Sequence, residues 1–288
     1  MAGDGLVDVG AARTLTESAP QAIKELIEWG VQFDRTESGE LALAREGAHC
    51  CRRVLHVRDA TGREISRALW NRLQATPNIR VIEDAWVTDI VVVDGECVGV
   101  RFQTAGDEFE VVGACSTLFA SGGAGYIFCE TTNPEVATGD GIAIGYRAGA
   151  EITDMEFVQF HPTGMVAPAS VKGILVTEGV RGDGGTLRNS DGERFMFNYI
   201  PDMFASETAD SEEEADLWYT DKVNARRTPD LLPRDEVARA IHAEVKAGRG
   251  SPSGGVYLDI ASRRDSDYIK RRLPSMYHQF MELSLIHI

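Results

Sequence analysis

Positive charge is scarce in this 288-residue chain. Its 29 Lys and Arg stand against 45 Asp and Glu, which gives a formal net charge of −16 at pH 7. Nucleic-acid phosphates are bound by clustered Lys and Arg, so we expect no nucleic-acid partner. The acidity would also repel a dianionic ligand at long range, and a site for one must therefore be locally positive. The candidates for that local charge are Arg181, Arg226, Arg227 and Arg234.

Cysteine is also scarce, and its spacing argues against two kinds of site. The five cysteines, at positions 50, 51, 97, 115 and 129, show neither metal-ligand spacing nor an even-numbered disulfide framework. We expect reduced thiols, as in cytosolic proteins, and no bound metal.

Long apolar runs are missing as well. Residues 111–129 carry no charge but include four Gly and several hydroxyl side chains, which makes this segment a poor membrane span. Residues 1–5 have the composition of neither a signal peptide nor an anchor. We therefore expect a chain with no direct membrane span.

Hydrophobic periodicity predicts a mixed α/β chain. Apolar residues recur at helical spacing over 11–30 and 63–74, and the phrase Thr-Gly-Asp-Gly at 138–141 precedes a helix that runs to residue 150. Another amphipathic helix is predicted over 234–247. The acidic stretch 207–221 is expected to be solvated helix and loop.

Between Ile79 and Phe119 the apolar period changes to two, which predicts a β-meander. Asp94-Gly95 marks a hairpin within it, because both residues tolerate positive φ. The predicted meander strands lie at 81–82, 87–93, 97–102 and 108–112. Outside the meander, strands are predicted at 118–120, 157–160, 173–176 and 254–260, of which the first two are expected to be buried.

A glycine-rich turn is the first candidate binding element. Gly122, Gly123, Ala124 and Gly125 directly follow the predicted strand 118–120. Backbone without a Cβ can approach a flat or phosphorylated ligand closely, although a tight turn alone would need the same residues. A G-x-G-x-x-G dinucleotide cradle, by contrast, is missing from the sequence.

A His, a Thr–Glu pair and two Arg form a candidate anion site. His161 lies in the phrase Gln-Phe-His-Pro-Thr-Gly. Thr177 and Glu178 are followed three residues later by Arg181, and Arg234 opens the predicted helix 234–247. Guanidinium and imidazole donors bind carboxylates, and a carboxylate–guanidinium pair can pass a proton. Each residue also has a structural alternative: a buried His, a helix cap, a local ion pair or a solvated Arg.

Together these phrases resemble the flavoprotein subunit of succinate dehydrogenase and fumarate reductase, most closely the actinobacterial type. The resemblance is fine-grained from about residue 156 to 282 and includes Arg-Arg-Thr-Pro-Asp-Leu-Leu-Pro at 226–233 and Arg-Leu-Pro-Ser-Met-Tyr at 272–277. It implies an α/β (α+β) fold of the fumarate reductase flavoprotein superfamily: the remainder of an FAD-binding domain with an inserted β-meander, plus a capping domain.

The resemblance also implies a division of the chain. Residues 1–155 would be a partial FAD-binding domain that lacks its N-terminal Rossmann motif, and 156–282 a truncated capping and catalytic domain. Residues 283–288 resemble translated sequencing-adapter read-through, and we expect them to be an artefactual tail.

The function implied by the resemblance is FAD-dependent interconversion of succinate and fumarate. Arg234 would move the proton while flavin N5 exchanges hydride, with Glu178 and Arg181 as its proton relay and Asp235 as a candidate to orient it. His161 and Thr177 would bind substrate. The implied FAD contacts are Gly122, Gly123, Ala124, Gly125 and Asp140, with Trp86, Val87 and Thr88 on the adenine side. Asp140 could equally be a helix N-cap.

Partners follow from the same resemblance. Electrons would pass to an iron–sulfur subunit, then to a quinone, and a membrane-anchor subunit would hold the complex at the cytoplasmic face of the inner membrane. The chain itself would be cytoplasmic. Because the Rossmann motif and the family's second substrate His and Arg are missing, we expect an internal fragment that is inactive alone and retains little flavin.

Two other functions remain open at this stage. Residues 53–65 are similar to L-aspartate oxidase, a close relative that oxidises L-aspartate to iminoaspartate. The second open function is that of an interaction module, a remnant of the family that binds no flavin. The phrases around His161 and Thr177 favour the dehydrogenase group.

Overall fold

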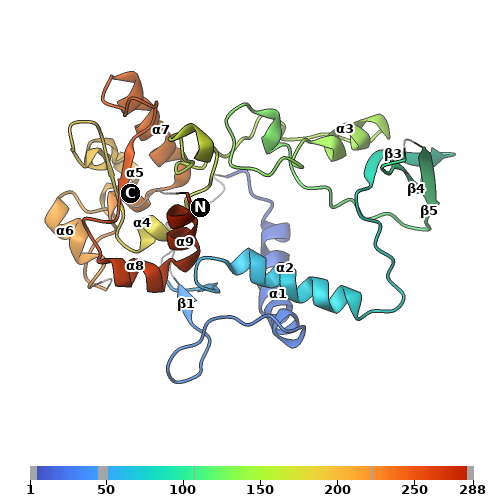
Figure 1. Ribbon diagram of the computed structural model, residues 1–288, viewed down its shortest axis with the longest axis horizontal. Helices are drawn as coiled ribbons and strands as arrows, with labels where there is room; N and C mark the ends of the chain where they lie inside the picture. Colours follow the sequence, from blue (N-terminus) through green and yellow to red (C-terminus); the bar gives the residue numbers. More distant parts are fainter. Residues whose placement is uncertain (1–4, 45–50, 107, 222, 284–288) are drawn as a thin grey trace. The chain divides into compact units, whose positions relative to one another are not determined.

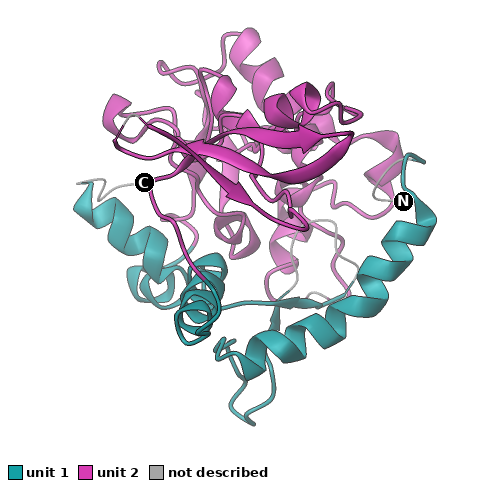
Figure 2. Ribbon diagram, turned by 90° about the vertical axis from the view of Figure 1, so that its right-hand side faces the viewer, with its two compact units in different colours: residues 1–79, 264–287 teal, residues 80–263, 288 magenta. Residues whose placement is uncertain are grey.

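The computed structural model describes residues 5–44, 51–106, 108–221 and 223–283 (Figure 1). The chain separates into two compact units, which Figure 2 colours differently. Unit 1 comprises residues 1–79 and 264–287, and unit 2 comprises 80–263. The domain boundary predicted at 155/156 falls inside unit 2 and stays a prediction. The expected artefactual tail lies, apart from Leu283, outside the described residues.

Unit 1 is built on two helices that enclose a small core. Its elements are α1 (Val9–Glu28), β1 (Leu43–Ala44), β2 (Val54–Leu55), α2 (Thr61–Gln74), α8 (Ser266–Arg272) and α9 (Pro274–Glu282). Apolar side chains of α1 and α2 pack around Val31, Phe33 and Ala68. The helices predicted over 11–30 and 63–74 are thereby confirmed.

The first part of unit 2 is the predicted β-meander. Its strands are β3 (Trp86–Val93), β4 (Glu96–Gln103) and β5 (Phe109–Gly113), paired antiparallel in that order. Asp94 and Gly95 form the β3–β4 turn with φ of 52° and 83°, as the sequence predicted. The strand predicted at 81–82 is wrong: both residues are exposed and precede the first pairing of β3.

The rest of unit 2 is a set of short elements and one longer helix. These are η1 (Gly125–Ile127), α3 (Asp140–Arg147), η2 (Ala169–Val171), α4 (Gly179–Gly182), β6 (Thr186–Arg188), η3 (Phe195–Tyr199), α5 (Asp202–Ala205), α6 (Glu212–Leu217), η4 (Pro229–Leu231), α7 (Arg234–Lys246) and β7 (Tyr257–Asp259). Their shared core is Leu187, Phe195, Met196, Leu232, Val237 and Ala240. The β6 strand pairs antiparallel with β7, so the strand predicted at 254–260 is confirmed in a shorter form.

Helix boundaries follow local backbone chemistry. The helix predicted over 234–247 is confirmed as α7. Helix α3 ends at Arg147, three residues before its predicted end, because Gly149 adopts φ 87° in the left-handed region and stops the helix.

The other predicted strands are corrected by the structure. Residues 118–120 and 157–160 form no strand, and Leu118 and Phe160 are 91% and 66% exposed. Residues 173–176 contribute only an isolated bridge between Leu175 and Gly164. An apolar run becomes a strand only where a neighbour accepts and donates its backbone hydrogen bonds, and no described segment does so for 118–120 or 157–160.

The described residues contain neither a membrane-spanning helix nor a metal-binding cluster. None of their helices is both long and apolar enough to cross a membrane. In the same residues, no three His, Cys, Asp or Glu side chains cluster closely enough to hold a metal ion. Cys97, Cys115 and Cys129 are free thiols, Cys51 Sγ accepts a hydrogen bond from Arg53 Nη2 at 3.3 Å, and Cys50 lies outside the described part.

A buried carboxylate fastens α7 to the core of unit 2. Glu244 is 1% exposed and accepts hydrogen bonds from Arg249, the Tyr199 hydroxyl at 2.6 Å and the Asn189 amide at 3.0 Å. The Arg249 guanidinium is the main cause that lowers the pKa of Glu244 from 4.5 to about 2.

We expect this carboxylate to make stability pH-dependent. Because the pKa is depressed in the folded state, the stabilisation is fully present above pH 4.5 and is lost as pH falls toward 2. Glu244→Gln should unfold at lower urea than the parent at pH 6 and differ less from it at pH 3. Glu213→Gln, at an exposed position on α6, is the control and should match the parent at both pH values.

Candidate active site

Arg234 bridges three segments of unit 2 that are far apart in sequence. It is the first residue of α7, directly after Pro233, whose fixed backbone suits a helix start. Its Nε donates to Glu178 Oε2 at 3.1 Å, and its Nη1 donates to Gln159 Oε1 at 3.0 Å. Nη2 makes no hydrogen bond with any described residue. The Nη2 nitrogen of the Arg234 guanidinium is therefore left to face a ligand.

Glu178 lies between two guanidinium groups. Its Oε2 is 3.1 Å from Arg234 Nε and 3.7 Å from Arg181 Nη2. The Glu178 side chain is 14% exposed, so this charge pairing is only weakly screened by water. Two cations around one carboxylate leave the cluster with net positive charge, which suits an anionic ligand.

Arg181 is the buried member of the cluster. It is 1% exposed, and its Nη1 donates to the backbone carbonyl of Asp230 at 2.6 Å. Burial lowers the pKa of Arg181, while the negative charges of Glu178 and Asp230 act in the opposite sense. A guanidinium that has lost solvation in this way binds its proton less tightly than one in water.

His161 is held in one tautomer by Thr163. The Thr163 backbone N–H donates to His161 Nδ1 at 3.3 Å, and the Thr163 hydroxyl donates to the Val176 carbonyl at 2.8 Å. Because a backbone N–H can only donate, Nδ1 is an acceptor and the proton of the neutral ring lies on Nε2. The ring therefore offers one N–H donor.

The charge of His161 is set by its surroundings. Burial, followed by the positive charges of Arg234 and Arg181, lowers the pKa of His161 to about 4, while Glu178 acts in the opposite sense. At neutral pH the ring is thus an uncharged hydrogen-bond donor. The structure brings His161, Glu178, Arg181 and Arg234 into one electrostatic cluster.

Thr177 serves the backbone as well as the candidate site. Its hydroxyl accepts from the Gly179 N–H at 3.3 Å, at the start of α4. The N-cap of α4 is Glu178, without a side-chain cap hydrogen bond, so the helix-capping alternative for Thr177 is wrong. The hydroxyl proton remains available to a ligand, so the substrate contact stays a prediction.

Of the glycines in the glycine turn, only Gly125 packs closely against other described residues, and the ligand approach expected from the turn's sequence stays a prediction. Gly139 N donates to the Gly123 carbonyl at 3.2 Å, which joins the turn to the start of α3. A Cβ on Gly125 would meet the Asn133 side chain at 2.2 Å, whereas Gly122 and Gly123 have nothing within 4 Å of a Cβ position. The turn is therefore packed on one side and open on the other, and this open glycine backbone fits a flat cofactor such as FAD.

The turn is connected to the His161 segment through residues 131–133. A Cβ on Gly164 would meet Thr132 Cγ2 at 2.9 Å, and one on Gly173 would meet the Thr131 carbonyl at 2.7 Å. These close contacts require glycine at positions 164 and 173. They place residues 131–132, which follow the glycine turn, against the loop that carries His161. That the cluster faces Gly122–Gly125 directly stays a prediction.

The adenine-side candidates lie on β3. Thr88 is the extra residue of a β-bulge, because Val87 pairs with Phe102 and Asp89 with Arg101. The Thr88 carbonyl accepts from Arg147 of α3, and Arg147 also pairs with Asp89 at 3.1 Å. The helix that begins at Asp140 is thus fastened to the bulge.

The remaining candidates on this side differ in setting. Trp86 is 60% exposed at the start of β3. Asp140 is exposed and is the first residue of α3, whereas the N-cap is Gly139 with φ 78°. The N-cap alternative for Asp140 is therefore wrong.

Two expectations about local charge are corrected. Asp235 pairs with Arg239 at 2.7 Å rather than with Arg234. Asp235 and Arg239 lie one helical turn apart, where oppositely charged side chains can meet. Arg226 is engaged by Asp210 and Glu214 on the surface, so its charge is offset away from the cluster.

Gln159 and Thr163 are functional candidates that sequence reasoning missed. A period of two in extended backbone places Gln159 on the same side as His161, which is the signal that could have identified it. Thr163 carried no signal of its own.

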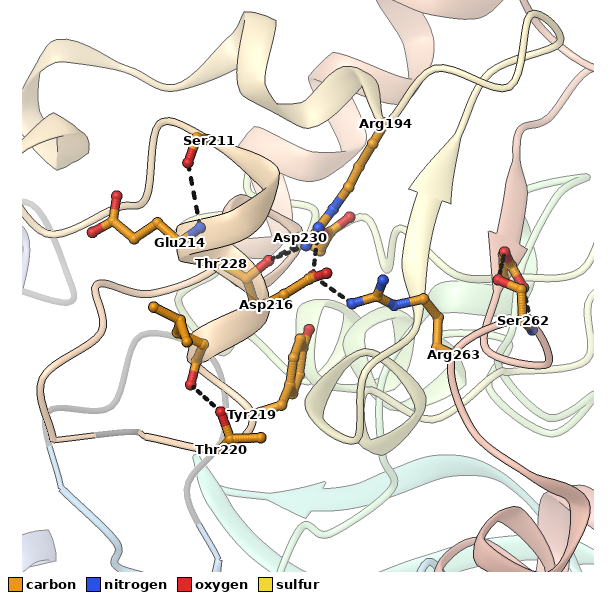
Figure 3. Close-up of polar contacts among 12 residues, drawn as sticks. Arg194, Ser211, Glu214, Asp216, Tyr219, Thr220, Thr228, Asp230, Ser262 and Arg263 are labelled. Atoms are coloured by element: carbon orange, nitrogen blue, oxygen red, sulfur yellow. Dashed lines mark hydrogen bonds and ion pairs between the residues drawn. The ribbon is translucent and has the colours of Figure 1, made fainter.

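A buried ionic network supports the cluster from the core (Figure 3). Arg194 and Asp230 have fully buried side chains and pair at 2.7 Å. Arg194 also donates to the Thr228 hydroxyl at 2.8 Å and to Asp216 at 3.0 Å, and Asp216 in turn accepts from Arg263. The Asp216 contact gives the acidic stretch 207–221 a structural role that its composition did not predict.

The chain matches one protein-family model, described as FAD binding domain, over residues 1–285. Among curated proteins, it is 39% identical to a fumarate reductase (CoM/CoB) chain of Methanothermobacter marburgensis over 287 residues, covering 99% of this chain and 47% of that protein. It is 37% identical to the L-aspartate oxidase of a Synechocystis species over 278 residues, covering 96% of this chain and 45% of that protein.

A solved structure is similarly close. Sdh1 of Mycobacterium smegmatis, in complex with UQ1, matches with a TM-score of 0.66 and 47% sequence identity, covering 93% of this chain and 42% of that chain. The chain thus spans less than half the length of these relatives.

Proposed function

The chain belongs to the FAD-binding domain family, and from that premise we propose that its protein interconverts succinate and fumarate. The observation that carries the proposal is the cluster in which Arg234 and Arg181 share the carboxylate of Glu178 beside a neutral His161. Such a cluster supplies cations for a dianion and a path for one proton.

Substrate binding is assigned to donors around the cluster. His161 Nε2–H and the Thr177 hydroxyl donate to one carboxylate, and the excess positive charge of Arg181 and Arg234 attracts the dianion. Carboxylates held against such donors polarise the carbon–carbon bond between them.

Proton transfer is assigned to Arg234 Nη2. Nε and one Nη1–H are engaged by Glu178 and Gln159, so we assign the substrate carbon to Nη2, whose two N–H groups have no acceptor among the described residues. An arginine gives up a proton only if it is rapidly replaced, and Glu178 with Arg181 forms the relay that replaces it. In the direction of succinate oxidation the same atoms take the proton away.

FAD supplies the two-electron chemistry when bound. Gly122, Gly123, Ala124 and Gly125 would line its flavin part together with Asp140. Trp86, Val87 and Thr88 would line its adenine part. We propose these contacts from the open glycine backbone and from the fastening of α3 to the Thr88 bulge. The expectation that the chain alone retains little flavin stays a prediction.

Oxidation of L-aspartate is the second candidate. It is supported by several relatives that carry the name L-aspartate oxidase, at 37–42% identity. The cluster would also bind the two carboxylates of L-aspartate, since the guanidinium groups of Arg181 and Arg234 recognise carboxylate charge.

The partners proposed are an iron–sulfur subunit plus a membrane-anchor subunit, with electrons passing to a quinone. This would place the protein in the cytoplasm at the inner membrane. The support is the similarity to Mycobacterium smegmatis Sdh1, whose structure is described in complex with UQ1. Co-purification of the protein from its native membranes tests the assembly.

Anaerobic flavin spectroscopy of the holoenzyme separates the two substrates. We expect succinate to bleach the flavin absorbance and fumarate to restore it, with L-aspartate slower. Faster bleaching by L-aspartate would promote the second candidate, and no bleaching by either would refute both.

For His161→Ala we expect KM for succinate to rise about 10-fold, with a smaller fall in kcat, because one carboxylate hydrogen bond is lost. His242→Ala, at an exposed position on α7, is the control and should leave both constants unchanged. Steady-state kinetics decides, and a kcat loss larger than the KM rise would contradict the binding role.

A further inference from the structure

Arg181 is held by hydrogen bonds at both its guanidinium and its backbone carbonyl. Its guanidinium Nη1 donates to the Asp230 carbonyl at 2.6 Å, and its own carbonyl accepts from the Tyr219 hydroxyl at 3.1 Å. The Tyr219 hydroxyl also contacts the Thr228 side chain, and Thr228 Oγ1 donates to Asp230 Oδ2 at 2.9 Å. Arg181, Tyr219, Thr228 and Asp230 thus form a ring of contacts. Because the Tyr219 and Thr228 hydroxyl protons go to the Arg181 carbonyl and to Asp230, the Tyr219–Thr228 contact in this ring is packing rather than a further hydrogen bond.

The Asp230 carboxylate is held in place by several hydrogen bonds, and this fixes the ring. It accepts from Arg194, from Thr228 and from the Leu187 backbone N–H at 2.8 Å, so that β6 also fixes it. Figure 3 shows Thr228, Asp230 and Arg194 converging, with Tyr219 nearby.

The guanidinium of Arg181 depends on this ring. Nε and Nη2 are buried without a hydrogen-bond partner among the described residues, and Glu178 is 3.7 Å from Nη2, beyond hydrogen-bond length. The Asp230 carbonyl is thus the hydrogen bond that sets how far this charge stands from Glu178.

We infer that Tyr219 and Thr228 are positioning residues, which act through Arg181 to set the charge felt by Glu178 and hence the proton relay to Arg234. The inference rests on the proposed function. Neither residue touches the proposed substrate; each keeps the Arg181 charge at its working distance.

Tyr219→Phe and Thr228→Val test this inference in the holoenzyme, since both keep side-chain volume. We expect each to lower kcat for succinate about 3- to 10-fold, the size of one buried hydrogen bond, with KM within about twofold of the parent. The acid limb of the pH–rate profile should move to higher pH, because a guanidinium that retreats favours the protonated Glu178. The double variant should be no slower than the slower single variant, because both break one ring.

Tyr257→Phe is the matched control, since Tyr257 is a half-exposed tyrosine on β7. A lowered melting temperature with an unchanged pH–rate profile in both ring variants would reduce Tyr219 and Thr228 to structural residues and overturn the inference. A parent enzyme without succinate or fumarate turnover would refute the proposed function instead.

A measurement independent of turnover tests whether the ring holds the Arg181 guanidinium. Nitrogen-15 NMR measures the exchange of the Arg181 guanidinium protons with solvent. We expect exchange at least about 10-fold faster in Tyr219→Phe than in the parent, as expected when a buried site opens locally. Equal rates in parent and variant would overturn the inference whatever the enzyme's substrate.

Discussion

Arg234→Lys should lower the turnover of succinate about 100- to 10,000-fold while the holoenzyme keeps its FAD, because it removes the proposed general acid–base group. Lysine keeps the charge but has one nitrogen where arginine has a planar fork of three. That nitrogen cannot donate to Glu178 Oε2 and Gln159 Oε1 in the Arg234 geometry and still face a substrate carbon. The loss should therefore appear in kcat more than in KM.

Arg239→Lys is the matched control for this substitution. Arg239 lies on the same helix, α7, but its side chain is 63% exposed and pairs with Asp235 and Glu236. We expect its turnover to equal that of the parent. Steady-state kinetics with succinate, together with flavin content from absorbance, makes the comparison. Near-normal turnover of Arg234→Lys would remove the proton-transfer role from Arg234.

Elements set by local chemistry could be predicted from the sequence. Asp94-Gly95 predicted its hairpin because positive φ is a property of those two residues and their turn. Helices α1, α2 and α7 were predicted because an apolar stripe at helical spacing needs only one face to bury.

Elements that depend on a distant partner could not be predicted from the sequence. The runs at 118–120 and 157–160 have strand-like composition, yet no described segment pairs with them. Composition reports the tendency to form a strand, whereas the strand itself requires a neighbour's hydrogen bonds.

The candidate site divides in the same way. His161, Glu178, Arg181 and Arg234 were predicted because their phrases resemble a known family, and the structure brings them into one cluster. Gln159 was missed because an amide carries no charge signal. The Arg194–Asp230 pair was missed because its members are 36 residues apart and only the fold shows that they meet.

The candidate cluster is joined to a buried ionic pair, Arg194 and Asp230, which lies beside the apolar core of unit 2. A buried carboxylate and guanidinium are costly to desolvate, and they are tolerated when each finds a partner. Asp230 has such partners in Arg194, Thr228 and Leu187, and its carbonyl holds Arg181. We therefore expect stability and the geometry of the proposed proton relay to depend on the same residue.

Asp230→Ala should lower the free energy of unfolding by about 3–5 kcal/mol, because it leaves the fully buried Arg194 without its closest counter-charge. The Leu187 N–H would also lose its acceptor in the interior. Asp210→Ala is the control, since Asp210 is 75% exposed and pairs with Arg226 at the surface, where such pairs contribute about 0–1 kcal/mol. Urea unfolding at pH 7, with equal m-values for parent and variants, measures both changes. If Asp230→Ala loses no more free energy of unfolding than Asp210→Ala, solvent reaches Arg194. The Arg194–Asp230 pair would then neither stabilise the fold nor position Arg181.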